Sequence, residues 1–217
     1  MIKAVIFDLD GVLISTDELH YRAWKALADR LGVPFDRAQN DRCRGISRMA
    51  SLDIVLERSP VEYTLGEKEA LAEEKNDNYR AMLASLSPAD VPEGVAPTLA
   101  LLRRRGYRLA LASASRNAPL ILERTGLGEY LDAVADGNCV TRSKPDPEVF
   151  LVAAEKLGVA PGDCAAVDDA LAGIEAARAA GMFAVGYGDS AAARAGDANL
   201  EKFTDLAELF PGMEGED

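Results

Sequence analysis

The stretch VIFDLDGVLIST, residues 5–16, places two carboxylates, Asp8 and Asp10, at the point where an apolar run stops. The run from Lys3 to Leu9 is short and contains β-branched residues, which is typical of a buried strand. Two carboxylates this close repel each other strongly unless a positive charge lies nearby. The balancing groups must therefore come from elsewhere in the chain.

The composition is that of a globular protein with an acidic surface. The chain has 217 residues, of which 48% are hydrophobic and 28% charged, and its formal net charge is −12. A surface of that sign repels nucleic acid and anionic lipid, so we expect neither nucleic acid nor a membrane as a partner. It does not exclude a small anionic substrate, because a local basic pocket can overrule the global sign.

The cysteines and the N-terminus indicate the compartment. Cys43, Cys139 and Cys164 are far apart and form no C-x-x-C pair, which argues against a disulfide framework or a zinc site and favours a reducing compartment. The N-terminus reaches Asp8 too early for the apolar core of a signal peptide, and no apolar run is long enough to span a bilayer. We therefore expect a cytoplasmic protein.

The pattern of the chain changes after the first predicted strand. Trp24, Leu27, Ala28 and Leu31 recur at helical spacing before Gly32, and the stretch on to about Leu86 is helical in composition. SPADVPEG, residues 87–94, is dense in Pro, Asp and Gly and is typical of a linker. The charge-rich helical stretch gives no sign of a large apolar interface, so we expect a monomer.

Beyond the linker, predicted strands alternate with predicted helices. The predicted strands are YRLALASAS (107–115), LDAVAD (131–136), CAAVDD (164–169) and MFAVGYG (182–188), and the predicted helices are APLILERTGL (118–127), DPEVFLVAAEKLGV (146–159) and ALAGIEAARAAG (170–181). This alternation predicts a parallel sheet covered on both faces. The simplest architecture is an α/β fold with a doubly wound, Rossmann-like parallel-sheet core and an inserted α-helical cap domain. We expect the core to comprise residues 1–16 and 90–217 and the cap residues 17–89, with hinges at the two crossings.

Polar side chains gather at one edge of the predicted sheet. In an open parallel sheet, ligands bind beyond the carboxyl ends of the strands. Four clustered carboxylates there require a hard cation, and Mg²⁺ binds carboxylates together with substrate phosphate and water. One carboxylate could attack phosphorus to give an aspartyl-phosphate, while a second protonates the leaving oxygen. The residues at this edge are Asp8, Asp10, Ser113, Ala114, Ser115, Lys144, Asp168 and Asp169.

Two plainer interpretations compete with this one. A lone D-x-D motif is weak, because aspartate commonly ends strands as a turn residue or a helix cap. A phosphoacceptor receiver domain also clusters acids at strand ends, but it would not need the helical insert. Taken together with Ser113, Lys144 and the 168–169 pair, the motif favours an enzyme of phosphoryl transfer.

The order of these motifs resembles that of the haloacid dehalogenase superfamily of phosphotransferases. The motifs are DLDGVL, the serine of LASAS, the lysine of SKPDP and the aspartates of VDD, and the helical insert is similar to that family's small helical cap. Longer stretches in both cap and core resemble the β-phosphoglucomutase family in particular. They are FDLDGVLISTDELHYRAWKALADRLG, RGISRMASL, EEKNDNY, SPADV, LASASRNAPLILER and SKPDPEVF, which extend over nearly the whole chain.

The resemblance implies a reaction and roles in it. β-D-glucose 1-phosphate and D-glucose 6-phosphate would interconvert through β-glucose 1,6-bisphosphate and an aspartyl-phosphate. Asp8 would be the nucleophile and Asp10 the general acid and base, while Ser113 and Lys144 hold the transferring phosphate. The Mg²⁺ ligands would be Asp8, Asp10, Asp168 and Asp169, with Asp10 also binding through its backbone carbonyl.

The resemblance also implies a distal phosphate site, because the bisphosphate must present its second end to Asp8. The substrate-binding residues fall into three groups. They are Arg48 with Ala114, Ser115, Arg116 and Asn117 for the distal phosphate; Lys75 with Gly45, Ile46 and Ser47 for contacts from the cap; and Thr16, His20 and Trp24 on the hinge side, where the family couples closure to Asp10.

Several of these residues also fit a purely structural role. Trp24 lies on the apolar face of its predicted helix, which favours core packing as much as substrate contact. Arg48 and Lys75 could be solvated charges. Ser115 and Asn117 could cap the next helix, which is compatible with phosphate binding because a helix N-terminus is a good anion site.

Three positions depart from the family pattern. Arg44 and Arg116 stand where the family has lysine, and Asp168–Asp169 stands where it has Glu-Asp. Arginine binds phosphate in a bidentate way, so these changes keep the charge but alter the geometry. The shorter Asp168 would reach Mg²⁺ only through water. The departures leave the chemistry intact and bear on the identity of the sugar.

Two other functions remain open from the sequence. A sugar-phosphate or phosphoglycolate-like phosphatase would share the aspartyl-phosphate but would use water to attack it. Arg48 and Lys75 favour the mutase, since a second phosphate needs positive charge away from the metal. A non-catalytic phosphate-binding module is the alternative of another class, and the intact set of Asp8, Asp10, Lys144 and Asp169 speaks against it.

Overall fold

The chain divides into two compact units. The computed structural model describes residues 1–43, 46–188 and 193–212. Unit 1 comprises Met1–Ser15 and Leu86–Asp217, and unit 2 comprises Thr16–Ser85. The chain therefore leaves unit 1 soon after its first strand and returns to it once.

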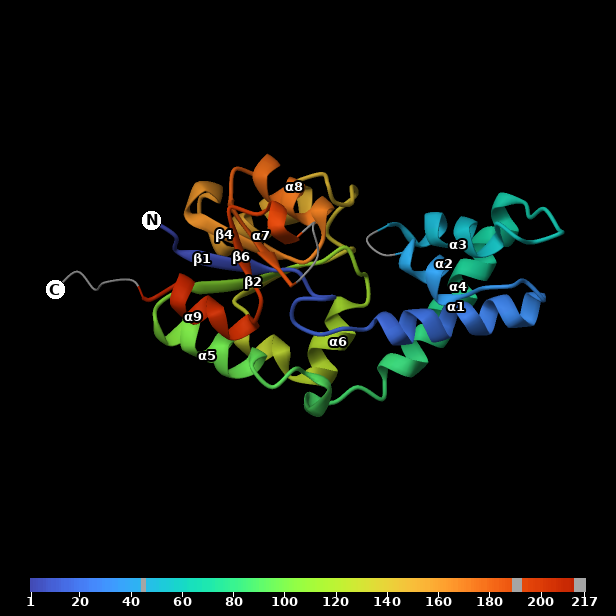
Figure 1. The fold of residues 1–217 in the computed structure, drawn as a ribbon, viewed down its shortest axis with the longest axis horizontal. Helices are drawn as coiled ribbons and strands as arrows, with labels where there is room; N and C mark the ends of the chain where they lie inside the picture. Colours follow the sequence, from blue (N-terminus) through green and yellow to red (C-terminus); the bar gives the residue numbers. More distant parts are fainter. Residues whose placement is uncertain (44–45, 189–192, 213–217) are drawn as a thin grey trace. The chain divides into compact units, whose positions relative to one another are not determined.

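Unit 1 is built around a six-stranded sheet with the strand order β3-β2-β1-β4-β5-β6 (Figure 1). The strand β1 (Ala4–Phe7) lies between β2 (Arg108–Ala112) and β4 (Cys164–Asp168), with Ala4 opposite Arg108 on one side and Cys164 on the other. Every strand pair is parallel, which confirms the predicted fold class. The other strands are β3 (Ala133–Ala135), β5 (Phe183–Tyr187) and β6 (Ala198–Leu200).

Helices cover both faces of this sheet. Figure 1 shows α7 and α8 on one face and α5 and α9 on the other. Alternate strand residues such as Ala4 and Ile6 lie in one buried cluster with Phe150 of α7 and Ile174 of α8, as the period of two in a strand requires. The helices of unit 1 are α5 (Val95–Arg104), α6 (Ala118–Thr125), α7 (Glu148–Leu157), α8 (Leu171–Ala179) and α9 (Leu206–Leu209).

The strand β1 is shorter than the sequence indicates. The prediction ran from Lys3 to Leu9, whereas the strand ends at Phe7. The chain then bends into a tight turn, in which the Gly11 N–H donates to the Ile14 carbonyl at 2.9 Å and the Leu13 N–H to the Leu9 carbonyl at 3.0 Å. The Asp8 N–H still donates to the Val167 carbonyl of β4 at 2.9 Å, so this residue lies directly at the carboxyl edge of the sheet, before the turn.

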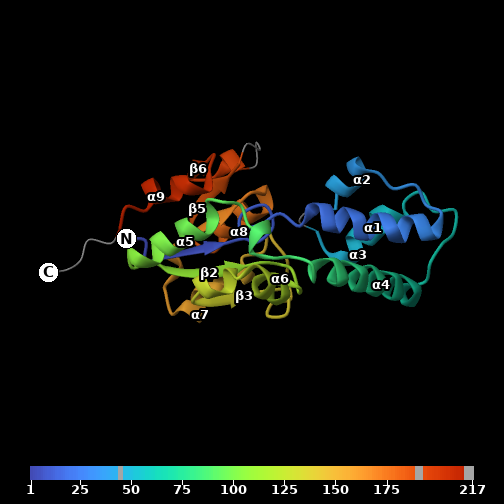
Figure 2. The same cartoon turned by 90° about the horizontal axis from the view of Figure 1, so that it is seen from below.

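Unit 2 is a bundle of helices with a core of its own. The helices α1 and α4 lie side by side in both views (Figures 1 and 2). Trp24, Leu27, Phe35 and Leu52 pack in its buried cluster. Gly32 ends α1 in the left-handed conformation with φ of 68°, as the sequence predicted for this stop. The helices are α1 (Asp17–Leu31), α2 (Arg37–Asp41), α3 (Arg48–Leu56) and α4 (Leu65–Leu83).

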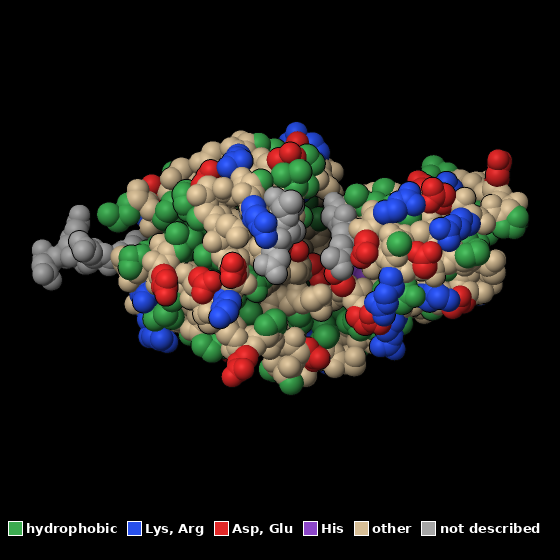
Figure 3. Space-filling view, in the orientation of Figure 1, with side chains coloured by type: hydrophobic (Ala, Val, Ile, Leu, Met, Phe, Trp, Pro, Cys, Tyr) green, Lys and Arg blue, Asp and Glu red, His purple; other side chains and the backbone are tan. Residues whose placement is uncertain are grey.

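Charged side chains of both signs are interspersed over the visible surface of each unit (Figure 3). Across residues 1–43, 46–188 and 193–212, no helix is both long and apolar enough to cross a membrane. Short 3₁₀ helices complete the described secondary structure. They are Pro88–Asp90, Leu127–Tyr130, Pro161–Asp163, Ala193–Ala195 and Phe203–Asp205.

Candidate active site

The carboxyl edge of the sheet brings Asp8, Lys144 and Asp168 together. The Lys144 Nζ lies 2.6 Å from Asp8 Oδ1, 2.8 Å from Asp168 Oδ2 and 3.0 Å from the Ala112 carbonyl oxygen. These three acceptors lie at the carboxyl ends of three neighbouring strands, β1, β2 and β4, and use all three donors of the ammonium group. The side chain of Lys144 is only 10% exposed. The lysine thus contacts two of the carboxylates that the sequence places at this edge.

Both carboxylate oxygens of Asp168 accept hydrogen bonds. Its Oδ2 accepts from Lys144, and its Oδ1 accepts from the Ala170 N–H at 3.0 Å. The side chain is 2% exposed. A Cβ on Gly173 of α8 would lie 1.9–2.2 Å from atoms of this carboxyl group, so only glycine leaves room for it.

A second glycine leaves room for Asp169. A Cβ on Gly11, which has φ of 83°, would lie 2.2 Å from Asp169 Oδ2. The turn after β1 therefore accommodates the carboxylate after β4. Gly11 belongs to the DLDGVL motif, and Gly173 to the predicted helix ALAGIEAARAAG. The role of both glycines becomes visible only in the structure.

Burial and mutual repulsion perturb the acids of this cluster. Burial raises the pKa of Asp8 to about 7, against the opposing charge of Lys144 and with the charge of Asp168 adding to the rise. Burial, with the charge of Asp168, raises the pKa of Asp169 to about 6. Burial alone would lower the pKa of Lys144, but the Asp168 and Asp8 carboxylates outweigh it and raise that pKa above its ordinary value. The cluster holds more negative charge than one lysine neutralises.

The donor set of this edge suits a hard cation. In the part of the chain that the structure describes, no three carboxyl, imidazole or thiol side chains are arranged as a metal site. Asp8 and Asp168 both contact Lys144 instead. The four aspartates offer oxygen alone, which is the ligand type that Mg²⁺ prefers. The surplus of negative charge also favours a cation, so the residues fit the predicted metal in their chemistry.

The loop from Ser113 to Asn117 connects β2 to α6. Ser113 is 3% exposed, and its hydroxyl accepts the Ser115 N–H at 3.1 Å. The Ser115 hydroxyl accepts the Asn117 N–H at 3.2 Å. Asn117 is the N-cap residue of α6, and its side chain makes no capping hydrogen bond within the described part of this helix. Asn117 is buried, whereas Ala114 and Arg116 are exposed. The sequence analysis missed Gly137 and Asn138, which border this loop; the run D-G-N after a strand is an ordinary turn signal.

The predicted cap residues of α1 and α4 form a second cluster, which lies within unit 2. The Lys75 Nζ is 2.9 Å from His20 Nδ1, and it lies over the rings of Trp24 at 4.5 Å and Tyr79 at 4.6 Å. The Tyr79 hydroxyl is 2.8 Å from Thr16 Oγ1, and its ring stacks on His20. Burial, together with the charges of Lys75 and Arg48, lowers the pKa of His20 to about 3.

The burial of this second cluster bears on the structural roles considered for Lys75 and Trp24 in the sequence analysis. Lys75 is 3% exposed and is therefore not a solvated surface charge. Trp24 is 2% exposed and packs in the core of unit 2, yet its ring also contacts Lys75. Tyr79 was not singled out from the sequence, although it ends the quoted stretch EEKNDNY.

The remaining cap residues lie at the start of α3. Arg48 donates to Glu73 at 3.1 Å and to Asn76 Oδ1 at 2.9 Å, both on α4. The Ser47 hydroxyl caps α3 by accepting the Ala50 N–H at 3.2 Å, and Ile46 is 43% exposed. Gly45 and the departure at Arg44 lie outside the described residues.

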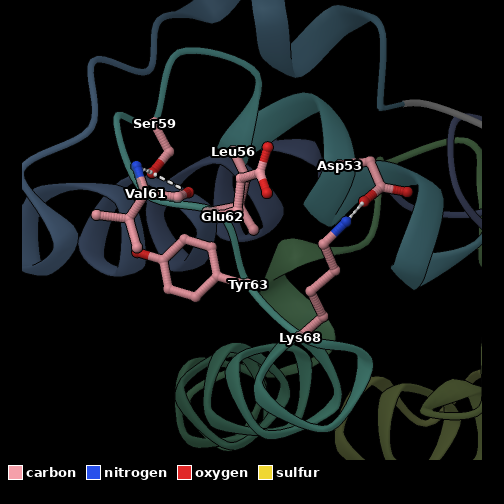
Figure 4. Close-up of a pocket in the computed structure, with 7 residues that line it drawn as sticks. All are labelled: Asp53, Leu56, Ser59, Val61, Glu62, Tyr63 and Lys68. Carbon is pink, nitrogen blue, oxygen red and sulfur yellow. Dashed lines mark hydrogen bonds and ion pairs between the residues drawn. The ribbon is translucent and has the colours of Figure 1, made fainter.

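Unit 2 also carries a cavity of about 370 Å³ (Figure 4). An ion pair between Lys68 and Asp53 at 2.6 Å lies on its wall. None of the site residues predicted from the sequence lines it, so it is separate from the candidate site. Its lining residues are Asp53, Leu56, Ser59, Val61, Glu62, Tyr63 and Lys68.

Comparisons with known proteins point to one group of phosphoryl-transfer enzymes. The model of the haloacid dehalogenase-like hydrolase family matches residues 2–181. The chain is 44% identical to the β-phosphoglucomutase of Bacillus subtilis over 94% of this chain and 91% of that protein. It is 33% identical to the phosphorylated carbohydrates phosphatase of Thermotoga maritima over 83% of this chain and 82% of that protein.

The fold agrees with a solved structure of the same kind. The crystal structure of β-phosphoglucomutase from Clostridium difficile superposes with a TM-score of 0.87 at 36% sequence identity. The match covers 95% of this chain and 93% of that chain. The similarity therefore extends over both units.

Proposed function

Because this chain belongs to the haloacid dehalogenase-like hydrolase family, we propose that it is a phosphoglucomutase that interconverts β-D-glucose 1-phosphate and D-glucose 6-phosphate through β-glucose 1,6-bisphosphate. The observation that carries the proposal is the buried contact of Lys144 with Asp8 and Asp168 at the carboxyl edge of the sheet. The relatives that are named β-phosphoglucomutase support the choice of substrate.

Asp8 is the nucleophile in this proposal. One of its carboxylate oxygens attacks the phosphorus of the bisphosphate, and the bond between that phosphorus and the sugar oxygen breaks. Asp10, two residues along the turn, donates a proton to the departing sugar oxygen. Lys144, beside Asp8, and the Ser113 loop hold the phosphoryl oxygens during this transfer.

The second half of the reaction reverses these roles. Asp10 takes the proton of a sugar hydroxyl, whose oxygen attacks the phosphorus of the aspartyl-phosphate and releases Asp8. The sugar must present its other end between the two halves. Arg48 and Lys75, with Arg116 and Asn117, are proposed to bind the phosphate or sugar that lies away from Asp8.

Asp8, Asp10, Asp168 and Asp169 would hold Mg²⁺, which when bound neutralises charge on the transferring phosphate. Lys144 then adds the positive charge that this chain itself supplies. The glycines at 11 and 173 give the metal-binding carboxylates their space. The small size of these two residues thus belongs to the site as much as the acids do.

A phosphatase is the second candidate function, because one relative is named as a phosphatase of phosphorylated carbohydrates. The two enzymes form the same aspartyl-phosphate and differ in whether water or a sugar hydroxyl attacks it. The buried ammonium of Lys75 favours the mutase, since it offers positive charge in a unit other than that of Asp8.

One assay with two readouts tests the proposal. The enzyme receives β-D-glucose 1-phosphate, Mg²⁺ and a trace of β-glucose 1,6-bisphosphate, and glucose 6-phosphate and free phosphate are followed together. We expect glucose 6-phosphate to rise with little free phosphate. Free phosphate as the main product would make the protein a phosphatase and contradict the mutase.

The variant Asp8→Asn tests the nucleophile in the same assay. We expect a loss of at least roughly 10³-fold in kcat, as for other enzymes that lose their nucleophile. Circular dichroism and thermal unfolding serve as the folding control. Asp29→Asn, an exposed carboxylate on α1 that pairs with Lys25, is the matched variant and should keep full activity. Turnover that survived Asp8→Asn would overturn both the mutase and the phosphatase.

A further inference from the structure

A turn after β3 borders the loop from Ser113 to Asn117, which we call the phosphate loop. The turn comprises residues 136–138. Its contacts continue the pairing of β2 and β3, in which Ala112 lies opposite Ala135. The Ser113 N–H donates to the Ala135 carbonyl at 3.0 Å, and the Gly137 N–H donates to the Ser115 carbonyl at 3.3 Å.

Gly137 lies against the backbone of the phosphate loop. A Cβ at this position would lie 2.3 Å from the Ala114 carbonyl oxygen and 3.0 Å from the Arg116 backbone nitrogen. A contact of 2.3 Å with backbone cannot be relieved by a side-chain rotation, so the loop itself would have to move. Glycine is therefore required for the observed position of the loop.

Asn138 is held in one orientation and in turn holds the loop. Its Nδ2 donates to the Arg116 carbonyl at 3.1 Å and to Asp136 Oδ2 at 3.2 Å, while its N–H donates to Asp136 Oδ1 at 2.9 Å. Asp136 is 5% exposed, so this anchoring carboxylate is fixed within the fold. The amide of Asn138 thereby connects a buried acid to the phosphate loop.

Together these contacts act on three successive carbonyls of the phosphate loop. Those of Ser115 and Arg116 accept hydrogen bonds from the turn, and that of Ala114 packs on Gly137. Within the described ranges, the N–H groups of Ala114 and Arg116 donate to no protein group. Backbone N–H groups that have no protein acceptor can donate hydrogen bonds to a bound anion.

We propose that Gly137 and Asn138 are positioning residues, which fix the phosphate loop in the form that binds phosphate. Neither residue contacts the substrate in this proposal; both act through the backbone of residues 114–116. The inference rests on the proposed function only in taking this loop as a phosphate-binding element. Whether water or sugar attacks the aspartyl-phosphate does not affect it.

The experiment compares four variants with the wild-type enzyme. Asn138→Ala removes the amide, and Asn138→Asp keeps its shape but places an oxygen against the Arg116 carbonyl and the Asp136 carboxylate. Gly137→Ala adds the Cβ against Ala114. Gly162→Ala is the matched control, because a Cβ there meets nothing within 4 Å. The affinity for inorganic phosphate in the presence of Mg²⁺ is measured by calorimetry well below the unfolding temperature, alongside kcat and KM.

We expect roughly tenfold weaker phosphate binding in Asn138→Ala, a larger loss in Asn138→Asp, and a fall in kcat/KM of roughly 10- to 100-fold, the scale of a displaced positioning group. Gly162→Ala should bind phosphate as the wild type does. Thermal unfolding verifies that each variant is folded; if Gly137→Ala does not fold, the two Asn138 variants decide.

Three results would overturn the inference. They are wild-type phosphate affinity in both Asn138 variants, an equal loss in Gly162→Ala, and no binding of millimolar phosphate by the wild type. A wild type that releases free phosphate instead of glucose 6-phosphate would overturn the mutase, while the comparison of phosphate affinities would still decide the role of the turn.

Discussion

Single residues show how burial selects a charge state in this protein. His20 and Lys75 lie 2.9 Å apart, and the pKa of His20 falls to about 3 through burial and the nearby positive charges. The imidazole is therefore neutral at physiological pH and can accept a hydrogen bond from the ammonium group. Tyr79 stacks on the same ring, so the histidine has a fixed orientation in unit 2.

The neutral His20 makes stability depend on pH. The unfolded chain binds a proton at this residue below its ordinary pKa of 6.5, while the folded chain does not until about pH 3. His20 should therefore lower the free energy of unfolding by about 2 kcal/mol as the pH drops from 7 to 5. Asp8 and Asp169 act in the opposite direction over this range, because their raised pKa values let the folded chain bind protons there that the unfolded chain does not bind. Urea denaturation at both pH values, on the wild type and on a variant without this histidine, isolates the contribution of His20.

The variant His20→Gln is the control for this pH dependence, because glutamine does not titrate. When the pH drops from 7 to 5, the change in its free energy of unfolding should be about 2 kcal/mol more favourable to the folded state than the change in the wild type, because Asp8 and Asp169 titrate in both proteins and only the His20 contribution differs. The two proteins need not be equally stable at pH 7, since only the difference in slope matters. Equal slopes in wild type and variant would contradict a buried, neutral histidine.

At the scale of elements, one position of α8 is occupied by glycine even though glycine has a low helix propensity. Gly173 lies within α8, where alanine is favoured over glycine by about 1 kcal/mol. A Cβ there would collide with the Asp168 carboxyl group. The helix thus keeps a residue of low helix propensity at the position that lies against the Asp168 carboxyl group.

The variant Gly173→Ala should therefore lose stability despite its better helix propensity. We expect a loss of about 1–3 kcal/mol in the free energy of unfolding, as for overpacked sites, together with loss of activity. Gly66→Ala in α4 is the matched helical control, because a Cβ there meets open space and should be neutral or stabilising by up to about 1 kcal/mol. Stabilisation by both substitutions, measured in urea, would contradict the collision.

The sequence predicted the strands and helices whose apolar residues recur with a clear period. It missed the elements that lack such a pattern. The strands β1 to β5 were found, with β3 inside the predicted strand LDAVAD, and α7 ends at Leu157 before Gly158 much as its pattern indicates. The edge strand β6 has only the residues Ala198–Leu200, too few for an alternating pattern to be read. The helix α5 was missed because it begins directly after the predicted linker and contains Pro97 in its first turn.

For the candidate site, the sequence predicts which side chains lie at the carboxyl edge of the sheet, but it does not predict which of them contact each other. The parallel sheet puts Asp8, Lys144 and Asp168 near one another, because ligands gather at the carboxyl ends of its strands. Which acids the lysine contacts depends on the loop around residue 144, which has no periodic signal. The turn at Gly137 and Asn138 was missed for the same reason: its importance lies in what it touches and not in its own pattern.

At the scale of the whole molecule, each unit has a buried apolar cluster of its own among the described residues. The cluster around Phe150 and Ile174 lies in unit 1, and the cluster around Leu27 and Leu52 lies in unit 2. Two cores of this kind can open separately, because local stability follows the local burial of apolar side chains. We therefore propose that the two units are domains with separate unfolding behaviour.

The variant Leu52→Ala tests this proposal. The side chain is fully buried in unit 2, so we expect a local loss of about 2–5 kcal/mol. Hydrogen exchange should accelerate in α1, α3 and α4 while β1 and β4 keep their protection. Ile174→Val, which removes one buried methylene in unit 1, is the control and should affect the sheet instead. Equal acceleration in both units would show a single cooperative unit.

The central place of β1 in the sheet has a consequence for synthesis on the ribosome. Its partners are Arg108–Ala112 and Cys164–Asp168, so the strand that leads to Asp8 has no neighbour until more than a hundred further residues have been made. The described helices of unit 2, α1 to α4, are translated before then. Asp8 is also without Lys144 until residue 144 has emerged. In the proposed reaction, a nascent chain therefore cannot act on phosphate esters until most of it has left the ribosome.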